Sequence, residues 1–337
     1  MPTTTRRVCF PEPMEVVLEE VELLALGTKD IRVRTDSTLI STGTELSSLV
    51  NKPWTTPNGQ TVPNYPSYTG YSNAGTVVEV GSEVSTCKEG DRVASGASHI
   101  GLATVNTNQA YWQVPEDVAF EDATFTILSA TVLNATRLGK PQLGDVAAVI
   151  GLGIIGQMTS QFVRLCGAEK VIGIDMDSFR LERGLAAGGI THTVNPGETD
   201  PVEAVRDLSE GRGADVVYEA TGLTPTFNLA FDLAKIKGNV VALGSPRWPA
   251  EVDMMQLHMK ALNLIGAIVS SHPNPGSDDN RWDRQANGEF FFRLLAENKV
   301  NMQELISHRF ASENAKDAFM LLVEKPEPIL AVQLKWG

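Results

Sequence analysis

The sequence has few cysteines and no long apolar run. Three of its 337 residues are cysteine, they lie far apart, and no two form a C-x-x-C pair. A disulfide framework is therefore not expected, which fits a reducing cytoplasm. No segment approaches the ~20 apolar residues of a membrane span, and residues 1–10 have no apolar core of signal-peptide length. We therefore expect a cytoplasmic protein without a membrane partner.

Basic residues are also scarce. Lysine and arginine total 28 against 41 aspartate and glutamate residues, so the formal net charge is −13. A nucleic acid or an anionic membrane would require a basic surface, so we expect neither as a partner. A hydrophobic content of 42% is ordinary for a globular protein with a sizeable core. The length favours two domains.

One glycine-rich stretch stands out against this ordinary background. The apolar run Val146–Ile150 is typical of a strand buried on both faces of a parallel sheet. A G-x-G-x-x-G turn follows at once and opens a helix, whose N-terminus attracts phosphates. The first glycine permits the tight turn, the second lets a pyrophosphate approach, and the third lets the helix pack closely. The predicted phosphate-binding residues are Gly151, Leu152, Gly153, Ile154, Ile155 and Gly156.

An acidic residue completes this pattern. A second apolar strand, Val171–Ile174, ends in Asp175, which lies roughly 20 residues beyond the turn. A carboxylate there accepts hydrogen bonds from ribose hydroxyls and repels a 2′-phosphate, so the sequence predicts NAD rather than NADP. We place Met176 and Arg180 beside the same ribose, although Arg180 can instead pair with the adenine or with Asp177. The alternative is an ordinary glycine-rich turn, but the flanking strand, helix and acid favour dinucleotide binding.

The rest of the chain has two kinds of pattern. Residues 1–120 contain repeated short strands, which suggest a barrel-like β domain. From 146 to 243 apolar strands alternate with amphipathic helices, and Leu262–Ile268 reads as a last strand, so we expect a doubly wound parallel sheet. Residues 289–298 and 313–324 have helical patterns, and 329–334 reads as a final strand.

These parts, in this order, resemble the medium-chain dehydrogenase/reductase superfamily, the alcohol dehydrogenase-like enzymes. The resemblance is carried by Ser41–Glu45, Gly70–Gly81, Gly90–Val93, the glycine turn and Glu219–Gly222. It implies an α/β protein with a GroES-like β-barrel catalytic domain (1–122 and 271–337), a Rossmann NAD-binding domain (123–270), and a cleft between them for nicotinamide and substrate. It also implies further cofactor contacts from Thr131, Thr221, Gly222, Gly244 and Ser245.

The departures from that family concern zinc. Where zinc-dependent relatives have cysteine, histidine and an acidic or cysteine ligand, this chain has Thr42, Tyr71 and Ile127. The four-cysteine structural loop is missing too, because a single cysteine, Cys166, follows Gly90. Catalytic zinc needs three thiolate, imidazole or carboxylate ligands. We therefore expect a zinc-free member. Its S-x-G-T-E and G-Y-S details resemble the bacteriochlorophyllide and cyclitol-type dehydrogenases.

Without zinc, a hydroxyl donor or a water must polarise the substrate oxygen. The phenol of Tyr71 can do this, or the ring can simply fill the former metal site. Ser72 and Thr44 are weaker candidates of the same kind. Glu45 is either a catalytic carboxylate or half of a capping box with Thr42, and the capping box is favoured. Histidine as a residue type can act as an acid or a base near neutral pH, which is the argument for catalysis by His99, but a structural role is favoured.

Three functions remain open at this stage. The first is an NAD-dependent, zinc-independent oxidoreductase that interconverts an alcohol and a carbonyl on a small, cyclic substrate. The second is a quinone or enoyl reductase that reduces a C=C bond with NADPH. The third is a protein that binds NAD(H) without turnover.

The strand Leu262–Ile268 also bears on assembly. An unprotected apolar edge strand exposes backbone groups that another strand can pair with. In the family that the chain resembles, this strand pairs with its two-fold mate across a dimer, so we expect a homodimer. The alternative is that the loop 270–285 of the same chain covers the strand.

Overall fold

A computed structural model describes residues 3–52, 54–55, 61–246, 249–275 and 281–337. It divides into two compact units. The β unit comprises Met1–Ile127, Gly288–Glu297 and Ile306–Gly337, and the Rossmann unit comprises Leu128–Asn287 and Asn298–Leu305.

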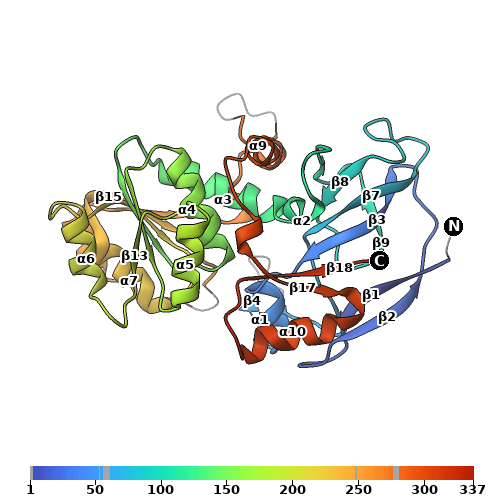
Figure 1. The fold of residues 1–337 in the computed structure, drawn as a ribbon, viewed down its shortest axis with the longest axis horizontal. Coiled ribbons are helices and arrows are strands. Elements are labelled where there is room, and N and C mark those ends of the chain that lie inside the picture. Colours follow the sequence, from blue (N-terminus) through green and yellow to red (C-terminus); the bar gives the residue numbers. More distant parts are fainter. Residues whose placement is uncertain (1–2, 53, 56–60, 247–248, 276–280) are drawn as a thin grey trace. The chain divides into compact units, whose positions relative to one another are not determined.

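The Rossmann unit contains one parallel sheet of six strands in the order β13-β12-β11-β14-β15-β16. This is the doubly wound order that the alternating pattern predicts. Figure 1 labels two of these strands, β13 and β15, among the helices that pack on the sheet. The strands are β11 (Val146–Ile150), β12 (Lys170–Ile174), β13 (His192–Val194), β14 (Ala214–Glu219), β15 (Ala234–Ala242) and β16 (Asn263–Gly266). Their helices are α3 (Thr126–Gly139), α4 (Ile154–Leu165), α5 (Ser178–Ala186), α6 (Pro201–Leu208), α7 (Thr224–Leu233) and α8 (Met254–Met259).

Helices cover both faces of this sheet, which is why its central strand β11 is apolar throughout. Every residue of β11 is buried. On one face β11 packs with α6 and α7 through Val205 and Phe231. On the other it packs with α3, α4 and α5, through side chains such as Val163 and Leu181. The two apolar faces of β11 thus fix the layered fold.

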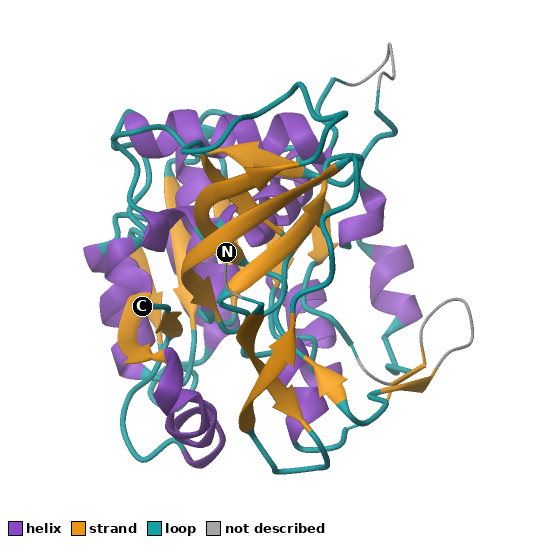
Figure 2. Ribbon diagram, turned by 90° about the vertical axis from the view of Figure 1, so that its right-hand side faces the viewer, coloured by secondary structure: helices purple, strands orange, loops and turns teal. Residues whose placement is uncertain are grey.

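The β unit is built mainly from short antiparallel strands, which Figure 2 shows as twisted orange arrows. One sheet has the order β2-β1-β6, and a larger one follows the path β10-β8-β7-β3-β18-β17, with β9 also paired to β3. The strands are β1 (Thr4–Phe10), β2 (Val17–Glu22), β3 (Asp30–Leu39), β4 (Trp54–Thr55), β5 (Thr61–Val62), β6 (Ser67–Tyr68), β7 (Asn73–Val80), β8 (Arg92–Ser95), β9 (Leu102–Asn106), β10 (Tyr111–Gln113), β17 (Ile306–Ala311) and β18 (Ala331–Lys335). The helices are α1 (Thr44–Leu49), α2 (Phe120–Ala123), α9 (Arg284–Ala296) and α10 (Ala315–Glu324).

The division between the units differs from the expected 1–122 and 271–337. Residues 123–127 stay with the β unit, where Ile127 packs in an apolar cluster with Trp112 and Phe292. Residues 271–275 and 281–287 stay with the Rossmann unit, where Ser271 and Trp282 contact α3. Ser271 accepts a hydrogen bond from Asn134 at 2.9 Å, and the guanidinium of Arg137 lies 3.6 Å from the ring centroid of Trp282.

Two further differences concern strands. The expected strand Leu262–Ile268 is shorter, and as β16 it lies at the edge of the Rossmann sheet beside β15. β17 was not expected from its mixed sequence. Among the described residues, no helix is long and apolar enough to span a membrane.

Candidate functional site

The glycine turn lies between β11 and α4, and its three glycines are required for different reasons. Gly151 has φ +86°, and a side chain there would meet the methyl group of Thr221 at 2.5 Å. A Cβ on Gly156 would lie 1.8 Å from the carbonyl oxygen of Gly151. A Cβ on Gly153, however, would meet no described atom within 4 Å beyond its chain neighbours. The protein itself therefore requires the first and third glycines, whereas the space beside the second suits a ligand.

The helix that follows is suited to an anion. Gly153 is the N-cap of α4, so the helix begins at a residue that has no capping side chain. Its first turn carries no acidic residue, which leaves the positive end of the helix dipole uncompensated there. The side chain of Ile154, at the first position of the helix, is buried, so this residue offers its backbone N–H group. The turn therefore fits the pyrophosphate of a dinucleotide.

Asp175 lies beside this turn, as the sequence predicts. Its Oδ2 accepts the backbone N–H of Leu152 at 2.7 Å, and its Oδ1 accepts that of Asp177 at 2.9 Å. Each oxygen keeps a lone pair for a ribose hydroxyl. Arg180 lies 3.8 Å from Asp175 and 3.6 Å from Asp177, so it is paired with the two carboxylates. The side chain of Met176 is 76% exposed.

Two loops meet at the carboxyl ends of β14 and β15. Glu219, which ends β14, is fully buried and accepts the N–H groups of Thr221 at 2.8 Å and Gly222 at 3.1 Å. Gly222 has φ +72°, and a Cβ on Gly244 would lie 2.2 Å from the nitrogen of Gly222. Thus Thr221, Gly222, Gly244 and Ser245 form one group.

Sequence reasoning assigned no role to Glu219, although the signal was the same as for Asp175: an acid that ends an apolar strand. Its carboxylate orders the 221–222 turn. Thr131 is half-buried on α3, whose Ala135 packs on the same face of the sheet as α4 and α5.

In the β unit, Glu45 and His99 form a buried pair. Nε2 of His99 lies 2.9 Å from Oε2 of Glu45, and the two side chains are 0% and 2% exposed. The same Oε2 accepts the hydroxyl of Thr69 at 2.7 Å. The capping box expected between Thr42 and Glu45 is wrong. Gly43 is the N-cap of α1, and Oε1 of Glu45 accepts the N–H of Ser41 at 2.8 Å, because the carboxylate turns inward toward the imidazole.

The other candidates of this unit lie close by in sequence. The hydroxyl of Tyr71 donates to Oγ of Ser41 at 2.5 Å, and its ring packs against a cluster that contains Ala74 and Ile127. Ser72 is buried, and its carbonyl accepts the N–H of Leu39. Thr44 is half-buried at the first position of α1. Sequence reasoning missed Ser41.

The surroundings of Thr42, Tyr71 and Ile127 do not fit a catalytic zinc ion. Ile127 is 6% exposed and belongs to the apolar cluster around Trp112. Among the residues that the structure describes, no group of three histidine, cysteine, aspartate or glutamate side chains converges to hold a metal. A zinc ion needs three such ligands.

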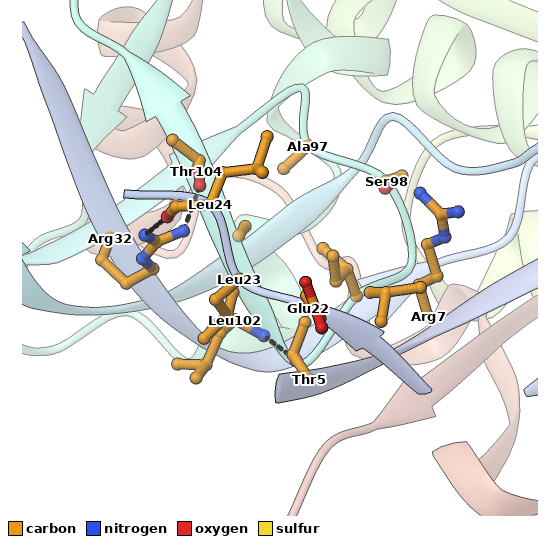
Figure 3. A pocket seen from close by; sticks show the side chains of 13 residues that line it. Thr5, Arg7, Glu22, Leu23, Leu24, Arg32, Ala97, Ser98, Leu102 and Thr104 are labelled. Carbon is orange, nitrogen blue, oxygen red and sulfur yellow. Dashed lines mark hydrogen bonds between the residues drawn. The ribbon is translucent and has the colours of Figure 1, made fainter. Parts of the chain in front are cut away.

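A pocket of about 290 Å³ lies elsewhere in the β unit (Figure 3). Its two arginines already have partners. The guanidinium of Arg32 donates to the hydroxyl of Thr104 and, at 2.6 Å, to the carbonyl of Leu24. Arg7 donates to Glu19 at 2.7 Å. None of the predicted catalytic or cofactor-binding residues lines this pocket.

Two family models match parts of the chain. A family model for the alcohol dehydrogenase GroES-like domain matches residues 27–118, and one for zinc-binding dehydrogenases matches residues 155–282. The chain is 29% identical to a putative D-xylulose reductase of Agrobacterium fabrum (strain C58), over 92% of this chain and 91% of the relative. It is 30% identical to the L-threonine 3-dehydrogenase of Symbiobacterium thermophilum, over 74% of this chain and 78% of the relative.

A solved structure shows the same fold. It is a putative zinc-binding dehydrogenase from Sinorhizobium meliloti 1021 bound to NADP, with a TM-score of 0.82 and 22% identity, over 99% of this chain and 100% of that one. The expected combination of a GroES-like and a Rossmann domain is thereby confirmed.

Proposed function

Because the chain belongs to the medium-chain dehydrogenase family of alcohol dehydrogenase-like oxidoreductases, we propose that it interconverts an alcohol and a carbonyl with NAD(H) and without zinc. The observation that carries this proposal is the open space at Gly153, beside the N-terminus of α4 and the carboxylate of Asp175. A bound nicotinamide would supply or accept the hydride. Asp175 supports NAD, since its carboxylate suits ribose hydroxyls and repels a 2′-phosphate.

The substrate oxygen would be polarised by this chain's own hydroxyl groups. Tyr71 is the strongest candidate, because its phenol can donate a hydrogen bond to a carbonyl oxygen and release a proton to it. Ser72 and Thr44 are weaker, Ser72 because it is buried. Glu45 and His99 are enclosed and bonded to each other, which supports the structural role that the sequence favoured for His99.

The substrate in this proposal is a small molecule with several hydroxyl groups. The relative named as a D-xylulose reductase supports a sugar or polyol. The resemblance of Ser41–Glu45 and Gly70–Ser72 to the cyclitol-type dehydrogenases supports a cyclic one. The two other functions, an NADPH-dependent reductase of C=C bonds and a non-catalytic NAD(H)-binding protein, are outcomes of the experiment that follows.

The experiment is a turnover screen with NAD and NADP against polyols, cyclitols and their ketones, together with enones and quinones, followed at the nicotinamide absorbance. We expect oxidation of a cyclic polyol with NAD. Reduction of an enone or a quinone with NADPH alone would favour the second function. Binding of NADH without any turnover would favour the third.

We expect the active protein to contain far less than one zinc ion per chain. The reason is that Thr42, Tyr71 and Ile127 stand where ligands would be required. Metal analysis of protein purified without chelators checks this, with turnover measured before and after chelation. One zinc per chain that is lost together with activity would refute the prediction.

We also propose a homodimer formed through β16. This strand lies at the sheet edge, where Leu264 is 44% exposed, and Ile268, two residues beyond the strand, is 56% exposed. Pairing of two such edges satisfies backbone groups and buries the apolar side chains. Leu264→Glu is expected to shift the protein toward monomer in sedimentation at micromolar concentration. The matched control is Leu185→Glu, since Leu185 is 47% exposed on α5. A wild-type monomer would overturn the proposal.

A further inference from the structure

A chain of hydrogen bonds leads from Tyr71 into the interior of the β unit. The phenol contacts Oγ of Ser41 at 2.5 Å. The backbone N–H of Ser41 donates to Oε1 of Glu45 at 2.8 Å. The hydroxyl of Thr69 donates to the other carboxylate oxygen at 2.7 Å. The residue that holds the phenol is therefore itself held by a buried carboxylate.

That carboxylate is fixed from the far side. Nε2 of His99 lies 2.9 Å from Glu45, and Nδ1 lies 2.7 Å from Oγ1 of Thr38. The indole N–H of Trp336 donates to the same Thr38 oxygen at 3.1 Å. The side chains of Glu45, His99 and Thr38 are all at least 98% buried. Thus α1 supplies the carboxylate, the 96–101 segment supplies its imidazole partner, and β3 supplies the hydroxyl that fixes the imidazole.

Such a network is poorly explained by stability alone. Burying a carboxylate carries a desolvation cost, and well-packed apolar residues often serve a core equally well. A buried polar network does, however, impose one arrangement on its members. Here that arrangement fixes Ser41, which contacts the phenol. A group that reacts with substrate must be held to within about 0.5 Å of its productive position.

We propose that Ser41 is the positioning residue of the Tyr71 phenol, and that the Glu45–His99 pair holds Ser41 in place. This rests on the proposed function, in which the phenol contacts the substrate oxygen. The hydrogen atom of each hydroxyl group can rotate about its C–O bond. The Ser41 hydroxyl therefore accepts a hydrogen bond from the phenol in the free protein, and it donates one to the phenolic oxygen once the phenol donates its own hydrogen bond to the substrate. The phenolic oxygen thus keeps one fixed partner throughout.

A double-mutant cycle on turnover tests the proposal. Ser41→Ala is expected to lower kcat about 10- to 100-fold and to leave the KM for the nicotinamide cofactor unchanged, because the phenol loses its placement. Ser41→Thr, which keeps the hydroxyl, restores most of kcat. In a Tyr71→Phe background, Ser41→Ala has no further effect, because the phenol is already absent. If the two losses multiply instead, Ser41 does not act through Tyr71 and the proposal is wrong.

The deeper pair is tested in the same way. Glu45→Gln and His99→Gln are expected to lower kcat in the presence of Tyr71 and not in the Tyr71→Phe background. Ser47→Ala is the matched control, because the hydroxyl of Ser47 bonds the Gly43 carbonyl within α1, outside the network. Equal losses in both backgrounds would assign the pair a purely structural role.

A second measurement does not depend on activity. The melting temperatures of wild type, Ser41→Ala, Tyr71→Phe and the double variant, without ligand, are expected to show a smaller combined loss than the sum of the single losses. Additive losses would exclude the contact between the two hydroxyls. A wild type that turns over no substrate would refute the proposed function and this proposal together, whereas an active wild type with multiplying kcat losses refutes this proposal alone.

Discussion

Gly153→Ala is expected to weaken binding of a nicotinamide dinucleotide by about 100-fold or more and to leave the fold intact. The added methyl group would meet no described atom within 4 Å beyond its chain neighbours, and φ −66° with ψ −174° suits alanine. The methyl group would instead occupy the space next to the N-terminus of α4. Two charge-assisted hydrogen bonds lost to a phosphate, at roughly 1.5–3 kcal/mol each, give this factor.

The free energy of unfolding of Gly153→Ala should rise, although its affinity for the cofactor falls. A glycine replaced by alanine at a compatible conformation gains roughly 0.4–1 kcal/mol through the unfolded state. We therefore expect an unchanged or slightly raised melting temperature, measured beside a fluorescence titration with NADH. Gly156→Ala is the contrasting variant, because its Cβ would lie 1.8 Å from a carbonyl oxygen and should destabilise the unit. Unaltered NADH affinity in Gly153→Ala would contradict the assignment of the turn.

Asp175→Ser is expected to reduce the preference for NAD over NADP by about 100-fold. The variant loses a charged acceptor for the ribose hydroxyls and removes the charge that repels a 2′-phosphate, each contributing roughly 1.5 kcal/mol or more. It also leaves Arg180 with Asp177, at 3.6 Å, as its remaining carboxylate partner, so that the guanidinium has one competitor fewer for that phosphate.

Titration of both cofactors measures the change in preference. Asp177→Ser is the control, because it also removes a carboxylate partner of Arg180, but this carboxylate caps α5 through the N–H of Phe179, whereas Asp175 accepts from the glycine turn. An equal change in the control would assign the effect to local charge and to Arg180 rather than to the position of Asp175. Tighter binding of NADP than NAD by the wild type would contradict the prediction outright.

The Rossmann unit was predictable because its signals are local. Five consecutive apolar residues in β11, a glycine turn and a helix lie within one short stretch, and parallel sheets bury both faces of their strands. The strand β17 was not predictable, since its sequence ISHRFA alternates imperfectly and its burial comes from pairing with β18. The unit boundary at 127 was missed because it depends on what Ile127 packs against.

The residues of the candidate site also fall into those that a local sequence signal reveals and those that only tertiary contacts reveal. Asp175 was found because it directly ends a strand of the fingerprint. Glu45 was read locally, as a cap for its own helix, but its partner His99 lies 54 residues away and only the folded sheet brings the two together. Ser41 was missed for the same reason, since nothing local distinguishes a serine that contacts a tyrosine 30 residues further along.

The position of β18 sets an order of folding during synthesis. In the larger sheet of the β unit, β18 lies between β3 and β17, and the ion pair between Lys335 and Asp36 spans 299 residues. At a rate of synthesis of roughly 5–20 residues per second, β18 is made about 15 to 60 s after β3. All six strands of the Rossmann sheet are made before β17 and β18. The Rossmann unit can therefore fold first on the ribosome. Until β18 is synthesised, the edge of β3 is open to pairing with other chains, unless a chaperone covers it or synthesis is fast.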